Sequence, residues 1–481
     1  MIDPNSSNSR LIREGMCGLL NRRDALRVGS LTIAASLLPA SRGQAEPIIP
    51  TEGRAKSVIY LWMGGGVTHI DSFDPKPEAP EQIRGTLDPI DTTLPGVHFT
   101  EVMPNLAKLA HKLALVRSFS HDSNDHLLSQ VYTLSGRKVN PQQLFSEPNI
   151  GSVISHLYGP RNGLPGYIAV PGCTRPGPPP YALFVGGWLG NQHAPFCVGG
   201  QPAQPDFTVG KKEYNPSPIV DEDLNPQELS SPGELTLGGL DRRSRLRESL
   251  EHSARVAEDA LRLRAMDGQY DSAFNLLLSP QVRGAFDVRK ESDATRDAYG
   301  RTKLGGRCLL ARRLVEAGAR FVMVDYGYDN DYGNFWDNHN APSQNFPHIC
   351  DMAKRGYHLA GMDKAFAGLI ADLDQRGLLD STLVVFLTEF GRTPKINKEG
   401  GRDHWGAAGS IFFTGGGSNV GQVIGATDKE AAYVTTRGYG PADIAATIYH
   451  AIGIDPETRV RDLQGRPVSV LDHGDLIDGV L

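Results

Sequence analysis

Four short apolar runs, each followed at once by a cluster of polar residues, constrain the fold of this chain more than any other feature. The clearest run, residues 382–388, is rich in β-branched side chains and is followed directly by Glu389. Runs of this kind are typical of strands that are buried on both faces of a parallel sheet. In open α/β sheets, ligands bind at the carboxyl ends of the strands. The pattern therefore predicts a central sheet with a polar site along one edge.

Segments with helical spacing separate the apolar runs. Residues 103–112 and 359–373 carry apolar side chains at this spacing, and residues 293–317 are expected to be largely helical. Residues 441–453 predict a short amphipathic helix that ends at a glycine. Strands that alternate with helices predict an α/β fold with a doubly wound, mostly parallel sheet.

The length of the chain bears on its domain organisation. Its 481 residues exceed the roughly 250–300 residues that one hydrophobic core usually reaches, so one large domain with inserted loops, or two domains, is expected. We predict a single α/β domain over residues 46–481. Many prolines and glycines at 137–234 predict inserted functional loops, and a charged segment at 241–266 predicts a surface helix.

The first 45 residues predict a targeting segment. Arg22 and Arg23 form a twin-arginine signature, an apolar stretch follows at residues 28–40, and small residues at 43–45 suit cleavage. That stretch is too short to span a bilayer stably, although an uncleaved anchor is the alternative. We expect export in folded form to the periplasm or beyond, with no stable membrane span once the segment is removed.

Charge and cysteine spacing exclude some partners and ligands. The formal net charge is -6 and no long basic run occurs, which argues against nucleic acid as a partner. Five cysteines show no CxxC spacing, which argues against a metal site built from thiolates. Neither observation sets the oligomeric state.

The first polar cluster follows the apolar run at residues 57–63. Its glycines would let backbone N–H groups approach an anion, and its acidic and imidazole side chains could hold a cation. The members that could carry chemistry are Gly64, Gly65, Gly66, His69, Asp71 and Ser72. The alternative is a tight turn in which Asp74 caps the chain before Pro75.

Two further clusters follow the runs at 113–117 and 320–325. In the first, His121, Asp125 and His126 could serve as ligands or as a general acid, or they could be ordinary structural groups. In the second, one residue separates Asp337 from His339, so an extended segment would project both side chains to the same side, towards one ion. The alternative there is a solvated loop that a tryptophan holds in place.

The fourth cluster combines acidic, imidazole and guanidinium groups. Its members are Glu389, Arg392, Arg402, Asp403 and His404. The planar fork of arginine suits a bidentate grip on phosphate, sulfate or carboxylate. Across the four clusters, oxygen and nitrogen ligands without thiolate fit Zn, Mn, Mg or Ca, as one ion or as a pair that acts on a bound ester.

Three sequence elements resemble those of an exported family of unknown function (DUF1501 type). The family's elements are a GG…HIDxFDPKP loop, a WDxH element and a TEFGRTP…GRDHW element. In this chain they are residues 65–77, residues 336–339, and residues 388–394 with 401–405. That family is in turn similar to a divergent branch of the alkaline phosphatase and sulfatase superfamily. The resemblance covers nearly the whole chain after residue 45.

This resemblance implies a set of metal ligands. By the order of the elements, the ligands would be Asp71, Asp337, His339, Glu389 and His404. The chain departs from the superfamily at Phe390, which stands where an imidazole is expected, so one of two metal positions should be weakened or lost. No nucleophile motif is present; Ser72 is the hydroxyl we assign to that role, with Ser120 as the alternative.

The sequence thus predicts a metal-dependent hydrolase of phosphate or sulfate esters, with a small molecule or a carbohydrate ester as the substrate. Arg392 or Arg402 would hold the non-bridging oxygens, and His126 or His69 would protonate the leaving group. The alternative is a non-catalytic exported binding or scaffold protein that keeps the fold with one metal or none, because fold does not imply function.

Overall fold

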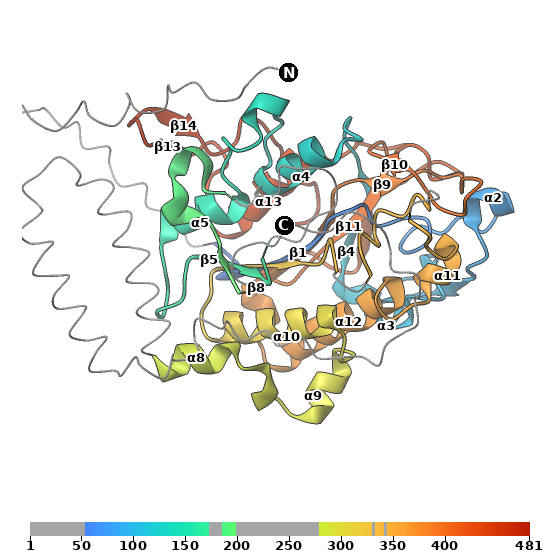
Figure 1. Cartoon of the computed structure of the whole chain (residues 1–481), viewed down its shortest axis with the longest axis horizontal. Helices are drawn as coiled ribbons and strands as arrows, with labels where there is room; N and C mark the ends of the chain where they lie inside the picture. Colours follow the sequence, from blue (N-terminus) through green and yellow to red (C-terminus); the bar gives the residue numbers. More distant parts are fainter. Residues whose placement is uncertain (1–52, 173–184, 199–278, 330–331, 341–343) are drawn as a thin grey trace, which may run out of the picture. The chain divides into compact units, whose positions relative to one another are not determined.

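The computed structural model describes residues 53–172, 185–198, 279–329, 332–340 and 344–481 (Figure 1). These residues all belong to one compact unit that spans residues 50–481. The targeting segment at 1–45 and the charged segment at 241–266 lie outside the described residues, so the expectations for them stay predictions.

An eight-stranded sheet lies at the centre of the described unit, in the order β12-β4-β11-β8-β1-β7-β5-β6. Its strands are β1 (Ser57–Met63), β4 (Ala114–Phe119), β5 (Tyr167–Val170), β6 (Phe196–Cys197), β7 (Phe321–Asp325), β8 (Thr382–Thr388), β11 (Gly409–Thr414) and β12 (Gln422–Ile424). Of these strands, β11 alone runs antiparallel to its neighbours. The carboxyl ends of β4, β8, β1 and β7 therefore meet at one edge of the sheet.

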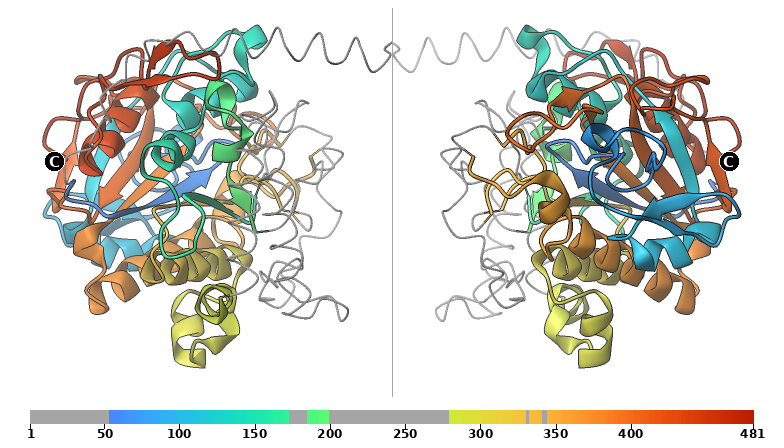
Figure 2. Two further views of the ribbon diagram at one scale, coloured as in Figure 1. Left: turned by 90° about the vertical axis from the view of Figure 1, so that its left-hand side faces the viewer. Right: turned by 90° about the vertical axis from the view of Figure 1, so that its right-hand side faces the viewer.

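Helices cover both faces of this sheet (Figures 1 and 2). The α-helices are α2 (Glu81–Arg84), α3 (Pro104–Lys108), α4 (His126–Ser135), α5 (Ile150–Tyr158), α8 (Pro280–Phe286), α9 (Asp293–Ala298), α10 (Lys303–Glu316), α11 (Ile349–Ala353), α12 (Leu359–Gln375) and α13 (Pro441–Ala451). Successive side chains of β1 enter two different cores, because strand side chains alternate between faces. Ile59 and Leu61 pack with residues of α3, α10 and α12, whereas Tyr60 and Trp62 pack with residues of α5 and α13.

Three two-stranded hairpins and several short 3-10 helices complete the regular structure of the described part. They are β2 (Pro89–Asp91) with β3 (His98–Thr100), β9 (Gly391–Arg392) with β10 (His404–Trp405), and β13 (Arg459–Arg461) with β14 (Pro467–Ser469). The β9–β10 hairpin follows β8 and is the one that bears on function.

The predicted doubly wound, mostly parallel α/β fold is confirmed by this topology. The prediction of loops at 137–234 needs a correction, because α5 and β5 from this segment belong to the core and β6 forms a half-buried edge of the sheet. Ile150, Val153 and Ile154 form a buried stripe at helical spacing, and β5 is wholly buried. The many prolines and glycines around these short elements hid them. Residues 173–184 and 199–234 lie outside the described part.

Two smaller expectations concern cysteines and the membrane. Two buried cysteines within the described ranges, Cys308 and Cys350, are free. Within those same ranges, no helix has the length and apolar character needed to cross a bilayer.

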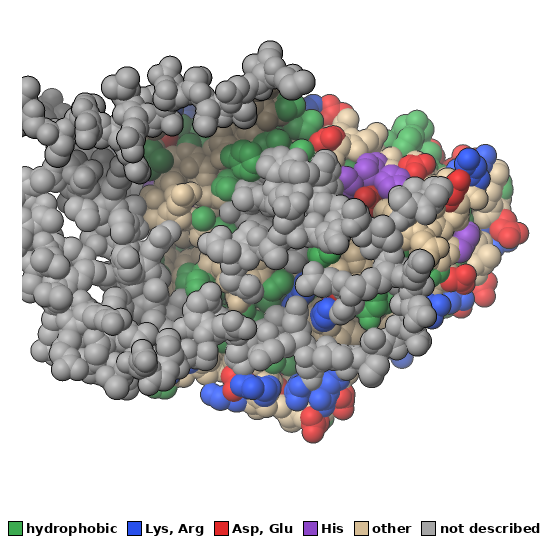
Figure 3. Space-filling view, viewed as in Figure 1, with side chains coloured by type: hydrophobic (Ala, Val, Ile, Leu, Met, Phe, Trp, Pro, Cys, Tyr) green, Lys and Arg blue, Asp and Glu red, His purple; other side chains and the backbone are tan. Residues whose placement is uncertain are grey.

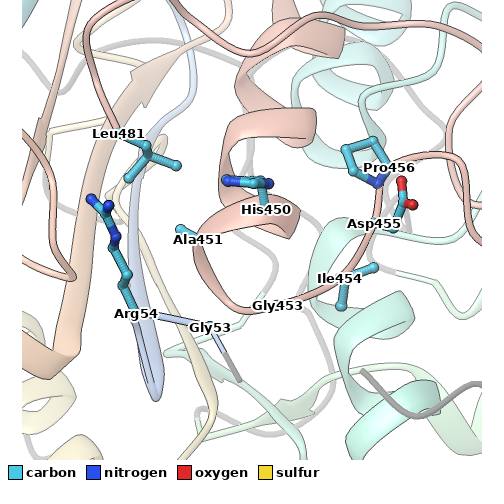
Figure 4. Close-up of a pocket in the computed structure, with 9 residues that line it drawn as sticks. All are labelled: Gly53, Arg54, His450, Ala451, Gly453, Ile454, Asp455, Pro456 and Leu481. Atoms are coloured by element: carbon cyan, nitrogen blue, oxygen red, sulfur yellow. The ribbon is translucent and has the colours of Figure 1, made fainter. Parts of the chain in front are cut away.

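A groove of about 560 Å³ lies beside the start of β1, away from the strands' carboxyl ends (Figure 4). Arg54, His450, Asp455 and Leu481 are among the residues that line it. His450 belongs to the last turn of α13. No convergent set of ligand side chains lies in this groove among the described residues, so its size does not mark the candidate site.

Candidate metal centre

Four segments bring polar side chains together at the carboxyl ends of the strands. The loop after β4 leads into α4, where Asp125 caps the helix by accepting a hydrogen bond from the Leu128 N–H, and His126 is the first helical residue. Glu389 follows β8 directly. The loop after β7 carries Asp337. Figure 3 shows histidine side chains at the surface near the β9–β10 hairpin, with acidic side chains beside them.

Three of these side chains form a group that could hold one metal ion. His126, Asp337 and His404 each offer a ligand atom, and these atoms lie within 4.8 Å of one another. His404 Nε2 lies 2.8 Å from Asp337 Oδ1, and His126 Nε2 lies 3.1 Å from Asp337 Oδ2. His339 adjoins the group, with its Nε2 2.9 Å from His404 Nε2 and 3.0 Å from Asp337 Oδ1.

The other ring nitrogen of each histidine is held by an oxygen outside the group. His126 Nδ1 lies 2.7 Å from Glu389 Oε2 and His339 Nδ1 lies 2.7 Å from Asp403 Oδ1. His404 Nδ1 lies 2.9 Å from the carbonyl oxygen of Asn124. A carbonyl or carboxylate oxygen only accepts, so each Nδ1 carries the proton and donates it. In the neutral rings, the three Nε2 atoms are therefore left with lone pairs.

Lone pairs that face one another and a carboxylate repel unless a cation or a proton lies among them. His126 Nε2 is buried and makes no hydrogen bond, although Asp337 Oδ2 is near. An unpaired buried nitrogen aimed at a carboxylate, with its Nδ1 fixed by an outer acceptor, is the arrangement that metal-binding histidines adopt. The residues at this edge thus fit a bound cation.

The pKa shifts of His126 and Asp337 also point to a site that binds a positive charge. Burial lowers the pKa of His126, but the carboxylates of Asp337 and Glu389 outweigh that effect and raise its pKa to about 10. Burial raises the pKa of Asp337, but His126 and Arg392 outweigh it and hold that pKa well below the usual range. Without an ion, these shifts favour a protonated His126 beside an ionised Asp337.

Exposure shows which side of the group faces solvent. The side chains of His126 and Asp337 are 9% and 12% exposed, whereas those of His404 and His339 are 19% and 28% exposed. The group is therefore closed on the His126 side and reachable from the His339 side.

Glu389 lies behind His126 rather than within the group. Its Oε2 accepts from His126, and its Oε1 accepts from the Gly65 N–H at 2.6 Å and from Gln130 Nε2 at 2.9 Å. Its backbone carbonyl accepts from His121 Nε2 at 2.6 Å. Both carboxylate oxygens are therefore occupied, and the geometry gives Glu389 the part of an anchor for His126.

Asp71 does not join the group. It is fully buried and forms a two-point ion pair with Arg402, whose Nε lies 2.8 Å from Oδ2 and whose second nitrogen lies 2.9 Å from Oδ1. Thr68 also donates to Oδ2 at 2.8 Å. Arg402 spends its remaining donors on backbone carbonyls, including that of Ile83. The structure therefore separates Asp71 and Arg402 from the roles we predicted, because each satisfies the other.

Arg392 holds the site together and is only 2% exposed. It donates to Asp337 Oδ1 at 2.7 Å, to the carbonyls of Gly65 and Gly66, and to the carbonyl of Arg402. These bonds use four of the five N–H groups of the guanidinium, so the structure places Arg392 as a support for Asp337 and the glycine loop. The one remaining N–H, on a buried side chain, is too few for the predicted two-point grip on a substrate anion.

The predicted nucleophile and second proton donor lie apart from the group. The Ser72 hydroxyl is buried and donates to the Thr68 carbonyl at 2.5 Å. His69 is buried, and its Nε2 lies 2.9 Å from the carbonyl oxygen of Ala431. Both side chains fix the loop after β1 instead of facing the lone pairs.

Sequence reasoning named Glu389 as a ligand instead of an outer acceptor, and it placed His126 in proton transfer, with a ligand role as the other interpretation. His126 was expected to move protons, yet it is central to the ligand group. Asn124 contributes a backbone carbonyl, which no side-chain pattern reveals. Phe390 packs its ring 4.5 Å from the ring of His404 and 5.4 Å from that of His126. The residue that replaces an expected imidazole thus forms an apolar wall of the site.

Comparisons with known proteins give distant structural neighbours. They include a sulfatase from Pseudoalteromonas sp. (14% identity, TM-score 0.35, covering 84% of this chain and 68% of that chain). A phosphonate monoester hydrolase from Silicibacter pomeroyi has 11% identity, a TM-score of 0.35 and coverage of 85% and 76%. An alkaline phosphatase from the Antarctic bacterium TAB5 has 13% identity, a TM-score of 0.35 and coverage of 84% and 99%. At such TM-scores, the fold assignment rests on the sheet topology.

A search of the curated proteins found no match to this chain. A family model, in contrast, matches residues 55–481, which is nearly the whole described unit. The chain belongs to the family described as "Protein of unknown function (DUF1501)".

Proposed function

We propose that this protein is an exported, metal-dependent hydrolase of phosphate or sulfate esters that holds one divalent ion at His126, Asp337 and His404. His339 would add a fourth ligand on the exposed side. The observation that supports this most is the convergence of the three Nε2 lone pairs on Asp337, with each Nδ1 proton tied to an outer oxygen. The ester class rests on the resemblance of this family, whose three sequence elements the chain carries, to the alkaline phosphatase and sulfatase superfamily.

The donor set narrows the choice of metal. Zinc commonly takes imidazole and carboxylate ligands, while Mg and Ca prefer oxygen alone. Three imidazoles with one carboxylate therefore favour Zn, with Mn next, among the metals considered from sequence. One ligand group of this kind occurs among the described residues, which supports one ion rather than two.

Each side chain would have a defined task. A divalent cation bound here would polarise an ester oxygen. Glu389 holds the His126 ring in the tautomer that presents Nε2, and Asp403 does the same for His339. Arg392 fixes Asp337 by a charge-assisted hydrogen bond of 2.7 Å. The greater exposure of His339 and His404 leaves that side open to a substrate.

A second candidate function is a non-catalytic binding or scaffold protein that keeps the metal. The observation that favours it is that the Ser72 hydroxyl, all the donors of Arg402 and four of the five N–H groups of Arg392 are used within the fold. A metal centre without a protein nucleophile or an anion clamp could serve structure or binding.

The two functions separate in one experiment on the folded chain. The protein is loaded with Zn or Mn, its bound metal is measured, and hydrolysis of aryl phosphates and aryl sulfates is followed. The hydrolase proposal expects metal and turnover in wild type, loss of both in His404→Ala, and no change in His450→Ala, a histidine in the distant groove. Bound metal without turnover on any ester would favour the binding protein. Absence of bound metal would reject the proposed centre.

A further inference from the structure

We propose that Trp336 and His358 form a clamp that positions Asp337 and thereby sets the metal affinity of the centre. This inference rests on the proposed function, because it concerns a ligand of the proposed ion. Neither residue contacts the ion's ligand atoms in the structure, so both would act as positioning residues.

Trp336 precedes Asp337 and is fixed on three sides. Its side chain is buried, and its indole N–H donates to the Tyr326 carbonyl at 2.8 Å. Its ring packs against the imidazole of His358, with centroids 4.4 Å apart and planes 37° apart. A Cβ added to Gly65 would come within 2.8 Å of the Trp336 Cβ, so the backbone of the two loops is in close contact. The residue before Asp337 therefore has little freedom to move.

His358 ties this loop to a long helix. It is 1% exposed and occupies the N-cap position of α12, the 17-residue helix that packs in the core. Its ring makes a hydrogen bond with the backbone of Phe335, two residues before Asp337. Its Nδ1 has no hydrogen-bond partner within the described residues, so this bond falls to Nε2.

The unpaired nitrogen indicates why an imidazole stands here. A buried polar atom without a partner costs about 1–3 kcal/mol, a cost that an apolar ring of similar size would avoid. Packing alone would therefore be served better by phenylalanine. The imidazole supplies one thing that phenylalanine lacks, the hydrogen bond that holds Phe335.

The clamp also reaches the other side of the centre through Gly65. The Gly65 N–H donates to Glu389, which orients His126, and the Gly65 carbonyl accepts from Arg392, which holds Asp337. Movement of Trp336 would press on this glycine, whose φ of 112° leaves no room for a side chain. Loosening the clamp should therefore shift Asp337 and His126 together.

The test compares substitutions that separate the hydrogen bond from packing. His358→Phe keeps a ring against Trp336 and removes the bond to Phe335. His358→Gln offers an amide that can replace the Nε2 donor. Leu369→Ala, in the buried face of α12 and further along the helix than His358, destabilises the same helix and leaves the His358 imidazole in place. Zn affinity is measured by competition with a chromophoric chelator, and stability of the metal-free protein by urea denaturation.

We expect His358→Phe to weaken Zn binding about 10-fold, as substitutions of residues behind metal ligands typically do. His358→Gln should recover part of this loss, and Leu369→Ala should lower stability while it leaves the Zn affinity unchanged. A Zn affinity for His358→Phe within twofold of wild type would overturn the clamp alone, as would equal weakening by Leu369→Ala. Failure of wild type to bind Zn would overturn the proposed centre and the clamp with it.

Discussion

Two buried carboxylates follow two strands that are neighbours in the sheet, yet their surroundings are opposite in charge and hydrogen bonding. Asp71 follows β1 and meets the guanidinium of Arg402 in a two-point ion pair. Asp337 follows β7 and meets the Nε2 atoms of three histidines, with one hydrogen bond from Arg392. The first carboxylate is neutralised by its own fold. Asp337, in contrast, faces mainly the Nε2 lone pairs of the three histidines. A bound cation would balance the negative charge of this carboxylate.

The difference shows that a carboxylate at a strand end is not enough to define a ligand. A guanidinium carries a permanent positive charge and no lone pair. A carboxylate paired with it is therefore already neutralised and needs no metal ion. An imidazole can present either a proton or a lone pair, and its outer partner decides which. The acceptors Glu389, Asp403 and the Asn124 carbonyl therefore distinguish the two regions as much as the histidines do.

The largest expected effect comes from removing a ligand of the Asp337 region. His404→Ala deletes one of the three Nε2 atoms, and we expect Zn affinity to fall by more than about 100-fold, beyond the effect of substitutions behind a ligand. Isothermal titration calorimetry on the refolded, metal-free protein measures this. Binding within 10-fold of wild type would remove His404 from the centre.

The matching change in the other region should affect stability instead. Asp71→Asn leaves Arg402 buried without its counter-charge, and breaking a buried ion pair in this way costs about 3–5 kcal/mol. Urea denaturation measures the loss, and the fraction that remains folded should keep its metal. Asp337→Asn is the contrasting variant, because it should abolish Zn binding. If Asp71→Asn lost metal at unchanged stability, the contrast between the regions would be wrong.

An intermediate effect is expected from the anchor of His126. In Glu389→Gln, an amide that keeps its oxygen towards Gly65 and Gln130 turns its N–H₂ towards the His126 Nδ1 proton, so the ring loses its acceptor. Zn affinity should fall about 10–100-fold. Glu147→Gln is the control, because Glu147 is a buried acid that pairs with Arg137 elsewhere in the fold. Equal effects of the two variants would argue against an anchoring role.

The smallest expected effect is a pH dependence of the metal-free protein. The folded-state pKa of His126 is raised to about 10, against an unfolded value of about 6.5, so its stabilising contribution is complete below pH 6.5 and is lost as pH rises through 10. With chelator present, wild type should be less stable at pH 9 than at pH 6.5, and Zn should remove this trend. His126→Gln should lack it. A wild-type trend identical to that of His126→Gln would contradict the protonation of His126 in the metal-free protein.

The positions of the strands could be predicted from the sequence, because a continuous apolar run indicates a strand that is buried on both faces. The run at 57–63 coincides with β1, and that at 382–388 coincides with β8. Short elements flanked by prolines and glycines, such as α5 and β5, were missed because composition over a long window concealed a few buried residues. The order of β1, β7 and β8 in the sheet needs contacts between segments hundreds of residues apart, which periodicity does not contain.

The candidate site was predictable in location but less so in membership. Its placement at strand ends follows from the sheet, and three of the five expected ligands, Asp337, His339 and His404, lie together, while Glu389 lies behind His126. The pairing of Asp71 with Arg402 joins residues 331 positions apart, so no local pattern indicates it. The anchoring of His404 by a backbone carbonyl is likewise invisible in a sequence.

The most direct test of the account is X-ray absorption spectroscopy of the Zn-loaded chain, with the metal counted in the same sample. The account predicts one ion per chain with scattering from imidazole nitrogens, which is lost in a His126→Ala/His404→Ala double variant and kept in Asp71→Asn. An ion that survives in the double variant, or a folded wild type that retains no ion after loading, would contradict it.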